Sequence, residues 1–228
     1  MQNLTAVAHR GDPYRLRENT IASLRSALDL GADAVECDVR LTRDGVPVLL
    51  HDATLKRLWG QDRPLASLSA AEVRGLTAGA VPTLAEALAA TEGSRVMLDL
   101  PGTREVRTAR RIVDAVREAG AADRVYYCAG AAAMLAVRSA DPAAEIALTC
   151  TSLAPPRPAL LAALKPRWLN YRFSLVDRDL TARVHRDGHL LSVWTPDTRR
   201  SLRRLIGLGV DSITTNRIDL LTALRKQG

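Results

Sequence analysis

The sequence contains little of several residue types, and each shortage excludes a class of protein. Among its 228 residues there are three cysteines, and aromatic side chains make up 4%. Cys37, Cys128 and Cys150 lie far apart, so they predict reduced thiols rather than a disulfide framework or a zinc site. So few aromatic rings cannot form the stacking surface that single-stranded nucleic acid needs. We therefore expect no nucleic-acid partner.

Long apolar runs are missing as well. No apolar stretch approaches the roughly 18 residues of a membrane-spanning helix, and the beginning of the chain lacks the basic and apolar segments of a secretory signal. We therefore expect no stable membrane insertion and a cytoplasmic location. Apolar residues still make up 47% of the chain, which predicts one folded domain over residues 1–228. No strongly apolar surface stripe is evident, which slightly favours a monomer and otherwise leaves the oligomeric state open.

Lysine is scarce too, and the positive charge comes almost wholly from arginine. Only three of the 32 basic residues are lysines, and with 25 acidic residues the net charge is +7. A basic protein can attract nucleic acid, anionic membranes or small phosphates. These arginines are spread along helix-like segments of an alanine-rich chain, however, so compositional bias explains the excess, which does not by itself indicate a binding surface.

Short apolar runs alternate with helix-like segments along the chain. Most of these runs are continuously apolar, as parallel strands buried on both faces are. They cover residues 4–9, 34–39, 46–51, 95–100, 124–129, 145–150, 167–171, 190–195 and 212–215. Between them, amphipathic stripes predict helices, and the segments SAAE (69–72) and TLAE (83–86) match the capping box of a helix N-terminus.

The turn Asp44-Gly45 distinguishes one of these nine runs from the other eight. It joins the runs 34–39 and 46–51 as a hairpin, and hairpin strands are antiparallel. The remaining runs alternate with helices, which predicts a (β/α)8 TIM barrel with a β-hairpin and a short rim excursion (52–80) after the second strand. In such barrels, functional residues lie at the C-terminal ends of the strands.

Acidic residues gather at these strand ends. Glu36 and Asp38 stand two apart on one strand, so their carboxylates share a face, and Asp99 ends the next barrel strand. Carboxylates on adjacent strands are hard oxygen ligands. They predict a site for one divalent cation, Mg²⁺ or Ca²⁺, with Mn²⁺ as a further candidate. The alternative is a buried ion network with the neighbouring arginines.

Two histidines and an arginine accompany the carboxylates. His9 and Arg10 end the first strand, and His51 ends the hairpin. Two histidines can serve as general acid and general base near neutral pH, and Arg10 can bind phosphate through two hydrogen bonds, unless it is only a counter-ion. The set predicts metal-assisted cleavage of a phosphate ester. One histidine would activate water or the substrate's own 2-hydroxyl, the other would protonate the leaving alkoxide, and the assignment between them stays open.

Four further residues are candidates for contact with the substrate. Trp194 and Asn216 end the seventh and eighth barrel strands, where they are expected to face a ligand, with ordinary core packing as the alternative for Trp194. Glu18 and Asn19 come at the start of a helix, so they either join the site or cap that helix.

Several motifs carry a resemblance to a known family. The chain resembles the glycerophosphodiester phosphodiesterases in HRG (9–11), ENT (18–20), GADAVECDVRLTRDGVPVLLHD (31–52), VPTLAEAL (81–88), VWTPD (193–197) and GVDSITTNR (209–217). The resemblance implies a (β/α)8 barrel, a divalent cation, and hydrolysis of a small-molecule glycerophosphodiester to glycerol 3-phosphate and an alcohol. It also implies His9 and His51 as the acid–base pair, and Glu36 and Asp38 as metal ligands.

The chain also departs from the family pattern. The family usually has Glu-x-Lys at the end of the third strand, where LDLPG (98–102) supplies Asp99 and Pro101. The lysine expected to neutralise the phosphate is therefore missing, and Arg10 or another arginine would have to compensate. Asn216 stands where the family has Asp. In this position the chain resembles the related sphingomyelinase D-type phospholipases instead.

Two other functions therefore stay open. A phosphodiesterase acting on lysophospholipids would need an apolar groove, which residues 55–68 with Trp59 could supply, unless this segment is only a packed rim loop. A non-catalytic barrel that binds phosphoryl ligands would bind glycerophosphodiesters or metal without hydrolysis, and Pro101 is its only support.

Overall fold

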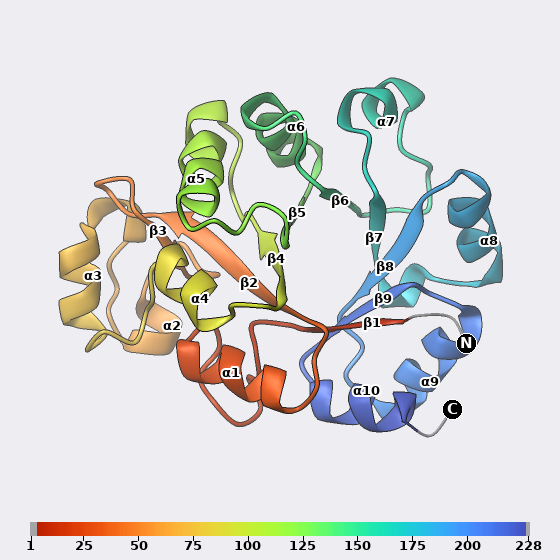
Figure 1. Ribbon diagram of the computed structural model, residues 1–228, viewed down its shortest axis with the longest axis horizontal. Coiled ribbons are helices and arrows are strands. Elements are labelled where there is room, and N and C mark those ends of the chain that lie inside the picture. Colours follow the sequence, from red (N-terminus) through yellow and green to blue (C-terminus); the bar gives the residue numbers. More distant parts are fainter. Residues whose placement is uncertain (1–3, 227–228) are drawn as a thin grey trace.

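A closed ring of parallel strands surrounded by helices forms the body of the protein in the computed structural model, which describes residues 4–226 (Figure 1). Hydrogen bonds connect the barrel strands in the order β1-β9-β8-β7-β6-β5-β4-β2, and pairing of β1 with β2 closes the ring. The expected eight-stranded (β/α)8 barrel is thus confirmed. Its strands are β1 (Thr5–Ala8), β2 (Ala34–Leu41), β4 (Arg95–Asp99), β5 (Val125–Ala129), β6 (Ile146–Cys150), β7 (Trp168–Arg172), β8 (Leu190–Trp194) and β9 (Ser212–Thr215).

Helices cover the outside of the ring and connect successive strands (Figure 1). Their bounds are α1 (Ile21–Asp29), α4 (Leu84–Ala90), α5 (Val106–Glu118), α6 (Ala131–Ala140), α7 (Pro158–Leu164), α8 (Arg178–Arg186), α9 (Arg199–Leu208) and α10 (Ile218–Arg225), with a short 3₁₀ turn (Phe173–Leu175) after β7. The capping box predicted at Thr83 and Glu86 forms at the start of α4, as does the one at Ser69 and Glu72. No helix in the described part of the chain is long and apolar enough to span a membrane.

The predicted hairpin is present and extends one strand of the barrel. Strand β3 (Pro47–Leu49) pairs antiparallel with the end of β2, where Val39 lies opposite Leu49. Because β3 supplies hydrogen bonds beyond the barrel wall, β2 runs to Leu41 instead of ending at residue 39. Glu36 and Asp38 therefore lie in the middle of β2 rather than at its end.

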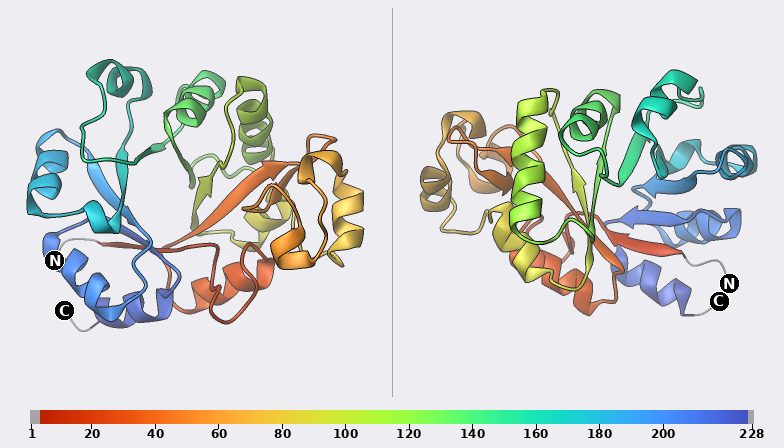
Figure 2. Two further views of the ribbon diagram at one scale, coloured as in Figure 1. Left: turned by 180° about the vertical axis from the view of Figure 1, so that it is seen from behind. Right: turned by 45° about the horizontal axis from the view of Figure 1, so that its top comes forward.

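The rim excursion after the hairpin forms a small lobe with its own apolar centre. Its elements, α2 (Lys56–Trp59), a 3₁₀ turn (Leu65–Ser67) and α3 (Ala70–Leu76), lie beside β3 at one edge of the barrel (Figure 2). The side chains that fill this satellite core are Val48, Leu50, Leu55, Leu65, Leu68, Val73 and Val81. Burial of each such leucine stabilises the folded chain by roughly 1.5–3 kcal/mol, so this core stabilises the packing of the lobe against the hairpin.

Alternation along the strands separates the two faces of the barrel wall. Outward side chains such as Leu98 pack under the helices in the main core, and Cys37 belongs to this layer, as its position between two inward carboxylates predicts. Burial raises the pKa of the Cys37 thiol well above its usual range. Inward side chains, Met97, Tyr126 and Trp168 among them, fill the barrel interior. The C-terminal end above them holds the polar residues.

The turn after β1 brings the chain close to α1. Gly11 has a φ of +84°, and a Cβ built there would lie 2.5 Å from the backbone carbon of Ser23 in α1. Only glycine fits this close approach. The turn aims the two residues before it, His9 and Arg10, over the end of the barrel.

Candidate active site

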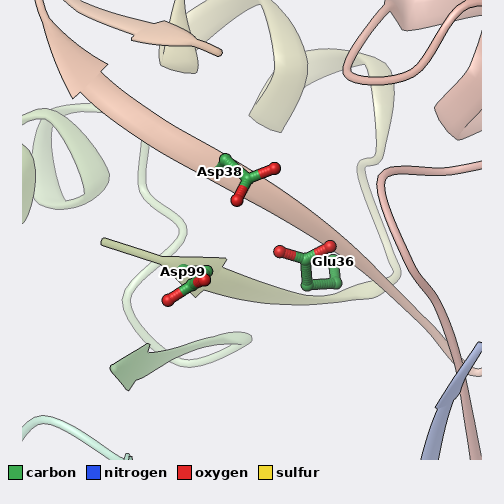
Figure 3. A group of neighbouring side chains, drawn as sticks. All are labelled: Glu36, Asp38 and Asp99. Atoms are coloured by element: carbon green, nitrogen blue, oxygen red, sulfur yellow. The ribbon is translucent and has the colours of Figure 1, made fainter. Parts of the chain in front are cut away.

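Three carboxylates point into a common space at the C-terminal end of the barrel (Figure 3). The parallel register sets Asp38 of β2 directly beside Asp99 of β4, and Glu36 lies two residues earlier on the same face of β2. One oxygen of each of the three side chains lies within 4.8 Å of the other two. The structure therefore brings together the three residues that were predicted as metal ligands.

Burial and mutual repulsion disfavour the ionised forms of Glu36 and Asp99 in this cluster. The pKa of Glu36 is raised well above its ordinary value by burial, to which the negative charges of Asp38 and Asp99 add. Burial, with the charge of Asp38 adding to it, also raises the pKa of Asp99 to about 6. The Oδ1 atom of Asp38 is buried and accepts no hydrogen bond from any described residue. Clustered hard oxygens that repel one another, one of them unpaired, fit a divalent cation.

Arg10 contacts three acidic residues. Its φ of 56° lets its backbone N–H donate to Glu36 Oε2 at 2.8 Å. Its guanidinium Nε lies 3.0 Å from Asp38 Oδ2, and Nη1 donates to Glu18 Oε1 at 2.9 Å. The structure thus shows Arg10 as the counter-ion of the cluster, and its contact with phosphate stays a prediction.

Asn19 fixes the orientation of Asp38. Its side-chain N–H group donates to Asp38 Oδ2 at 2.8 Å, and its side-chain oxygen accepts from the backbone N–H of Asp38 at 3.1 Å. Neither Glu18 nor Asn19 caps α1, because the N-cap is Thr20, whose hydroxyl accepts from Ser23 N–H at 3.2 Å. The capping alternative is therefore wrong for both residues.

His9 is held by a chain of two polar residues after β9. Its Nδ1 lies 2.7 Å from Asn216 Oδ1, and the Asn216 amide N–H group donates to Asp197 Oδ2 at 2.7 Å. Because Asp197 takes the amide N–H, the amide oxygen faces His9, and Nδ1 must be the donor. Nε2, which lies 3.9 Å from Glu36 Oε2, is then the acceptor. Burial, reinforced by the charge of Arg10, lowers the pKa of His9 and so favours its neutral form.

His51 has a different partner. Its Nδ1 lies 2.7 Å from Asp52 Oδ1, and the other oxygen of Asp52 accepts from Arg57 Nε at 2.6 Å. This contact with Arg57 is the main reason why the pKa of Asp52 is lowered to about 2. Arg57 also donates to Glu18 at 2.6 Å. Hydrogen bonds and ion pairs therefore run from the hairpin to the acidic cluster, in the order His51, Asp52, Arg57, Glu18, Arg10 and Asp38.

Sequence reasoning gave Asp52, Arg57 and Asp197 no role in the site. The sequence contained a signal for two of them: Asp52 directly follows the candidate His51, and Asp197 lies in the family segment VWTPD. Arg57 gave none, because it lies 39 residues along the chain from Glu18, the partner that it meets.

A cavity of about 540 Å³ opens beside the carboxylates. His9, Glu36, Asp99 and Trp194 line it, so four of the predicted site residues meet there. The other predicted residues, His51 among them, do not line this cavity. Asn216 and Arg10 contact its lining residues His9 and Glu36. Asn19 contacts Asp38, Glu18 contacts Arg10, and His51 contacts Asp52. Pro101 lies in the cavity wall.

The floor of the cavity contains two polar residues that sequence reasoning missed. Asn170 of β7 and Thr214 of β9 are buried, and the Oδ1 of one and the Oγ1 of the other have no hydrogen-bond partner within residues 4–226. The indole Nε1 of Trp194 is likewise buried without a partner among these residues. The signal for Asn170 and Thr214 was their inward position in the strand alternation. These atoms can hydrogen-bond to hydroxyl groups that enter the cavity.

The two remaining histidines take part in the frame of the barrel. His185 Nε2 lies 2.7 Å from Asp211 Oδ2, and His189 Nδ1 lies 2.9 Å from the carbonyl oxygen of Pro166. Neither residue lines the cavity.

Comparison with known proteins identifies the family. Residues 9–220 match the glycerophosphoryl diester phosphodiesterase family. A glycerophosphodiester phosphodiesterase of Caldanaerobacter subterraneus is 28% identical and covers 97% of this chain and 98% of its own length. A probable glycerophosphodiester phosphodiesterase 2 of Mycobacterium tuberculosis is 31% identical, over 95% of this chain and 88% of its own.

A solved structure shows the same fold. The phosphodiesterase of Oleispira antarctica in complex with the product sn-glycerol-3-phosphate superposes with a TM-score of 0.89 at 21% identity, over 97% of this chain and 96% of that one. The matched family segment spans the barrel from His9 to α10 and so includes every residue of the site described above. The chain therefore belongs to the glycerophosphoryl diester phosphodiesterase family of phosphoric diester hydrolases.

Proposed function

We propose that this protein hydrolyses glycerophosphodiesters to glycerol 3-phosphate and an alcohol, using a divalent cation and two histidines. One observation carries the proposal: three carboxylates gather at one point with His9 Nε2 3.9 Å from Glu36, and His9 and His51 have separate, fixed partners. The glycerophosphodiester phosphodiesterases among the relatives support the substrate class, and the Oleispira antarctica phosphodiesterase binds sn-glycerol-3-phosphate as its product.

Glu36, Asp38 and Asp99 would hold the cation, with Mg²⁺ or Ca²⁺ as the candidates and Mn²⁺ as a third. When bound, the cation neutralises negative charge on a non-bridging phosphoryl oxygen. The contacts of Asp38 support its role as a ligand. Asn19 and Arg10 both contact its Oδ2, whereas its buried Oδ1 has no partner among the described residues and could bind a cation. Burial, and after it the charges of the neighbouring carboxylates, raises the pKa of Glu36 and of Asp99, and a bound cation would favour the ionised form of both.

The hydrogen-bond partners divide the roles of the two histidines. His9 donates through Nδ1 to a neutral amide, so its Nε2 can accept a proton from water or from the 2-hydroxyl of the substrate. His51 donates through Nδ1 to the ionised carboxylate of Asp52, which fixes the ring and leaves Nε2 free to donate a proton to the leaving group. We assign His9 as the general base and His51 as the acid that protonates the leaving alkoxide.

The cavity supplies the groups that orient the substrate. Trp194 forms part of its wall, and Asn170 and Thr214 place unpaired oxygen atoms on its floor. These atoms suit the hydroxyl groups of a glycerol moiety. Glu18 and Asn216 would not contact the substrate directly. Glu18 positions Arg10, and Asn216 positions His9.

The decisive assay measures release of glycerol 3-phosphate from glycerophosphocholine. It is run after chelation, and again with Mg²⁺, Ca²⁺ or Mn²⁺ restored, on the wild-type protein and on the His51→Ala variant. We expect cation-dependent release and a loss of about 10²- to 10⁴-fold in kcat for His51→Ala. His185→Ala is the matched control, because that histidine pairs with Asp211 before the start of β9, at the opposite end of the strand from Asn216, and should leave kcat unchanged. Full activity in His51→Ala would refute the mechanism.

The same assay separates the two alternative functions. A lysophospholipid substrate needs an apolar groove, yet Trp59 packs against the satellite core of the rim lobe, with the Arg17 guanidinium 4.2 Å from its ring centre. Residues 55–68 contribute nothing to the main cavity. Release of choline-containing product only from lysophosphatidylcholine would nevertheless identify a lipid enzyme. Binding of glycerophosphocholine without release under any cation would identify a non-catalytic binder.

A further inference from the structure

The charges around the cavity leave the phosphoryl group of the substrate without a positive partner from the residues described so far. This inference rests on the proposed function, in which a phosphodiester anion enters a cavity lined by Glu36 and Asp99. Arg10 is held between Asp38 and Glu18, at 3.0 and 2.9 Å. A second anion competes poorly for a guanidinium that two carboxylates already engage.

Two other arginines near the site are also engaged. Arg57 is bound by both Asp52 and Glu18. Arg40 projects from β2, and its Nε donates to the backbone oxygen of His51 at 2.7 Å, which ties the hairpin to the barrel. Arg40 lines a separate cavity of about 190 Å³ rather than the main one. Arg57 cannot turn to a substrate without giving up these contacts, and Arg40 faces the separate cavity.

Arg104 is the remaining candidate. It lies between β4 and α5, directly after the cavity-lining residues Pro101–Thr103, and it is the one arginine or lysine within residues 4–226 that lines the main cavity. Its side chain is exposed and makes no ion pair or side-chain hydrogen bond with another residue of the described chain. The guanidinium is therefore free to bind an anion in the cavity.

The neighbouring wall strengthens the positive potential. Residues 130–133 at the start of α6 line the same cavity, and the N-cap Gly130 has no side chain to accept from the first N–H groups of the helix. The N-terminus of this ten-residue helix adds a partial positive charge beside Arg104. We propose that Arg104 binds the phosphoryl group of the substrate and supplies the positive charge that Pro101, in the same wall, does not.

Two variants test this assignment directly. Arg104→Met removes the charge, and Arg107→Met is the matched control, since Arg107 is the next exposed arginine along the chain and lines neither cavity. Calorimetry with Mg²⁺ measures the Kd of glycerol 3-phosphate, and kinetics measures kcat/KM for glycerophosphocholine. We expect Arg104→Met to raise Kd and lower kcat/KM by about tenfold or more. Arg107→Met should change each by less than about twofold.

Rescue distinguishes binding by Arg104 from a structural role. Arg104→Lys keeps the charge and should retain more affinity than Arg104→Met. Pro101→Lys in the Arg104→Met background places an ammonium in the same cavity wall and should recover part of the lost affinity. A loss of affinity that neither lysine restores would overturn the proposal, as would an unchanged Kd in Arg104→Met. If the wild-type protein binds glycerol 3-phosphate but hydrolyses no diester, the proposed function fails while the comparison of Kd values still decides the role of Arg104.

Discussion

Replacing Asp99 by asparagine should stabilise the cation-free protein at neutral pH. The pKa of Asp99 is raised from 3.8 to about 6, chiefly by burial and then by the charge of Asp38. Each pH unit by which a pKa moves corresponds to about 1.4 kcal/mol, so ionised Asp99 lowers the free energy of unfolding by at most about 3 kcal/mol. Asparagine has the same shape as aspartate. Its side-chain oxygen can still accept the hydrogen bond that the Leu100 backbone N–H donates to Asp99 at 2.9 Å in the wild type.

The size of this effect depends on pH. Below about pH 4 the carboxyl group is protonated in both the folded and the unfolded chain, so Asp99→Asn should match the wild type. Between pH 4 and 6 the unfolded chain loses its proton first, and the wild type loses stability relative to the variant. Above pH 6 the gap is full, at about 6 to 12 °C in Tm for a chain of this length. Calorimetric scans of both proteins in a chelating buffer across this range measure it.

A bound cation should reverse the order. At a concentration 1,000 times its Kd, a ligand stabilises the folded wild type by about 4.1 kcal/mol, which exceeds the gap of about 3 kcal/mol, whereas Asp99→Asn has lost one of three ligands and should gain much less. His51→Ala serves as the control that keeps all three carboxylates and the full rise in Tm. The reasoning is refuted if Asp99→Asn is less stable than the wild type at pH 7.5 under chelation, or if both proteins gain equally from Mg²⁺ and Ca²⁺.

Three further substitutions probe the frame of the site. Gly11→Ala forces a Cβ to 2.5 Å from the α1 backbone at a φ of +84°, and should lower the free energy of unfolding by about 2–4 kcal/mol in urea titration. Asp52→Asn removes the charge beside His51 and should lower kcat at least about tenfold while leaving KM nearly constant, and an unchanged kcat would exclude Asp52 as a positioning residue. Asn19→Ala frees Asp38 to rotate and should weaken cation affinity about 10- to 100-fold, as measured by the rise in Tm during cation titration.

Short-range patterns in the sequence were enough to predict the barrel. Continuous apolar runs marked the strands, and the Asp44-Gly45 turn identified β3 as a hairpin strand outside the ring. Both are local signals, because strand periodicity and turn geometry depend on residues close together in the chain. The pairing of Glu36 with Asp38 on one face followed from the same periodicity, and closure of the barrel added Asp99 beside them.

Local patterns could not show which side chains bind one another across the mouth of the barrel. The sequence placed Glu18 and Asn19 at a helix start with capping as one reading, whereas the fold uses Thr20 as the cap and turns Asn19 to Asp38. It offered Arg10 as a phosphate ligand or a counter-ion, and the structure surrounds it with carboxylates.

The sequence by itself determined the fold class and the set of residues at the strand ends, because alternation and turn chemistry are written in neighbouring positions. Only the tertiary structure decided which partners those residues contact. The separate supports of His9 and His51, the engagement of Arg10 and the freedom of Arg104 depend on contacts between segments far apart in the chain. Such contacts exist only after the barrel has closed, because closure alone brings the ends of all its strands to one mouth.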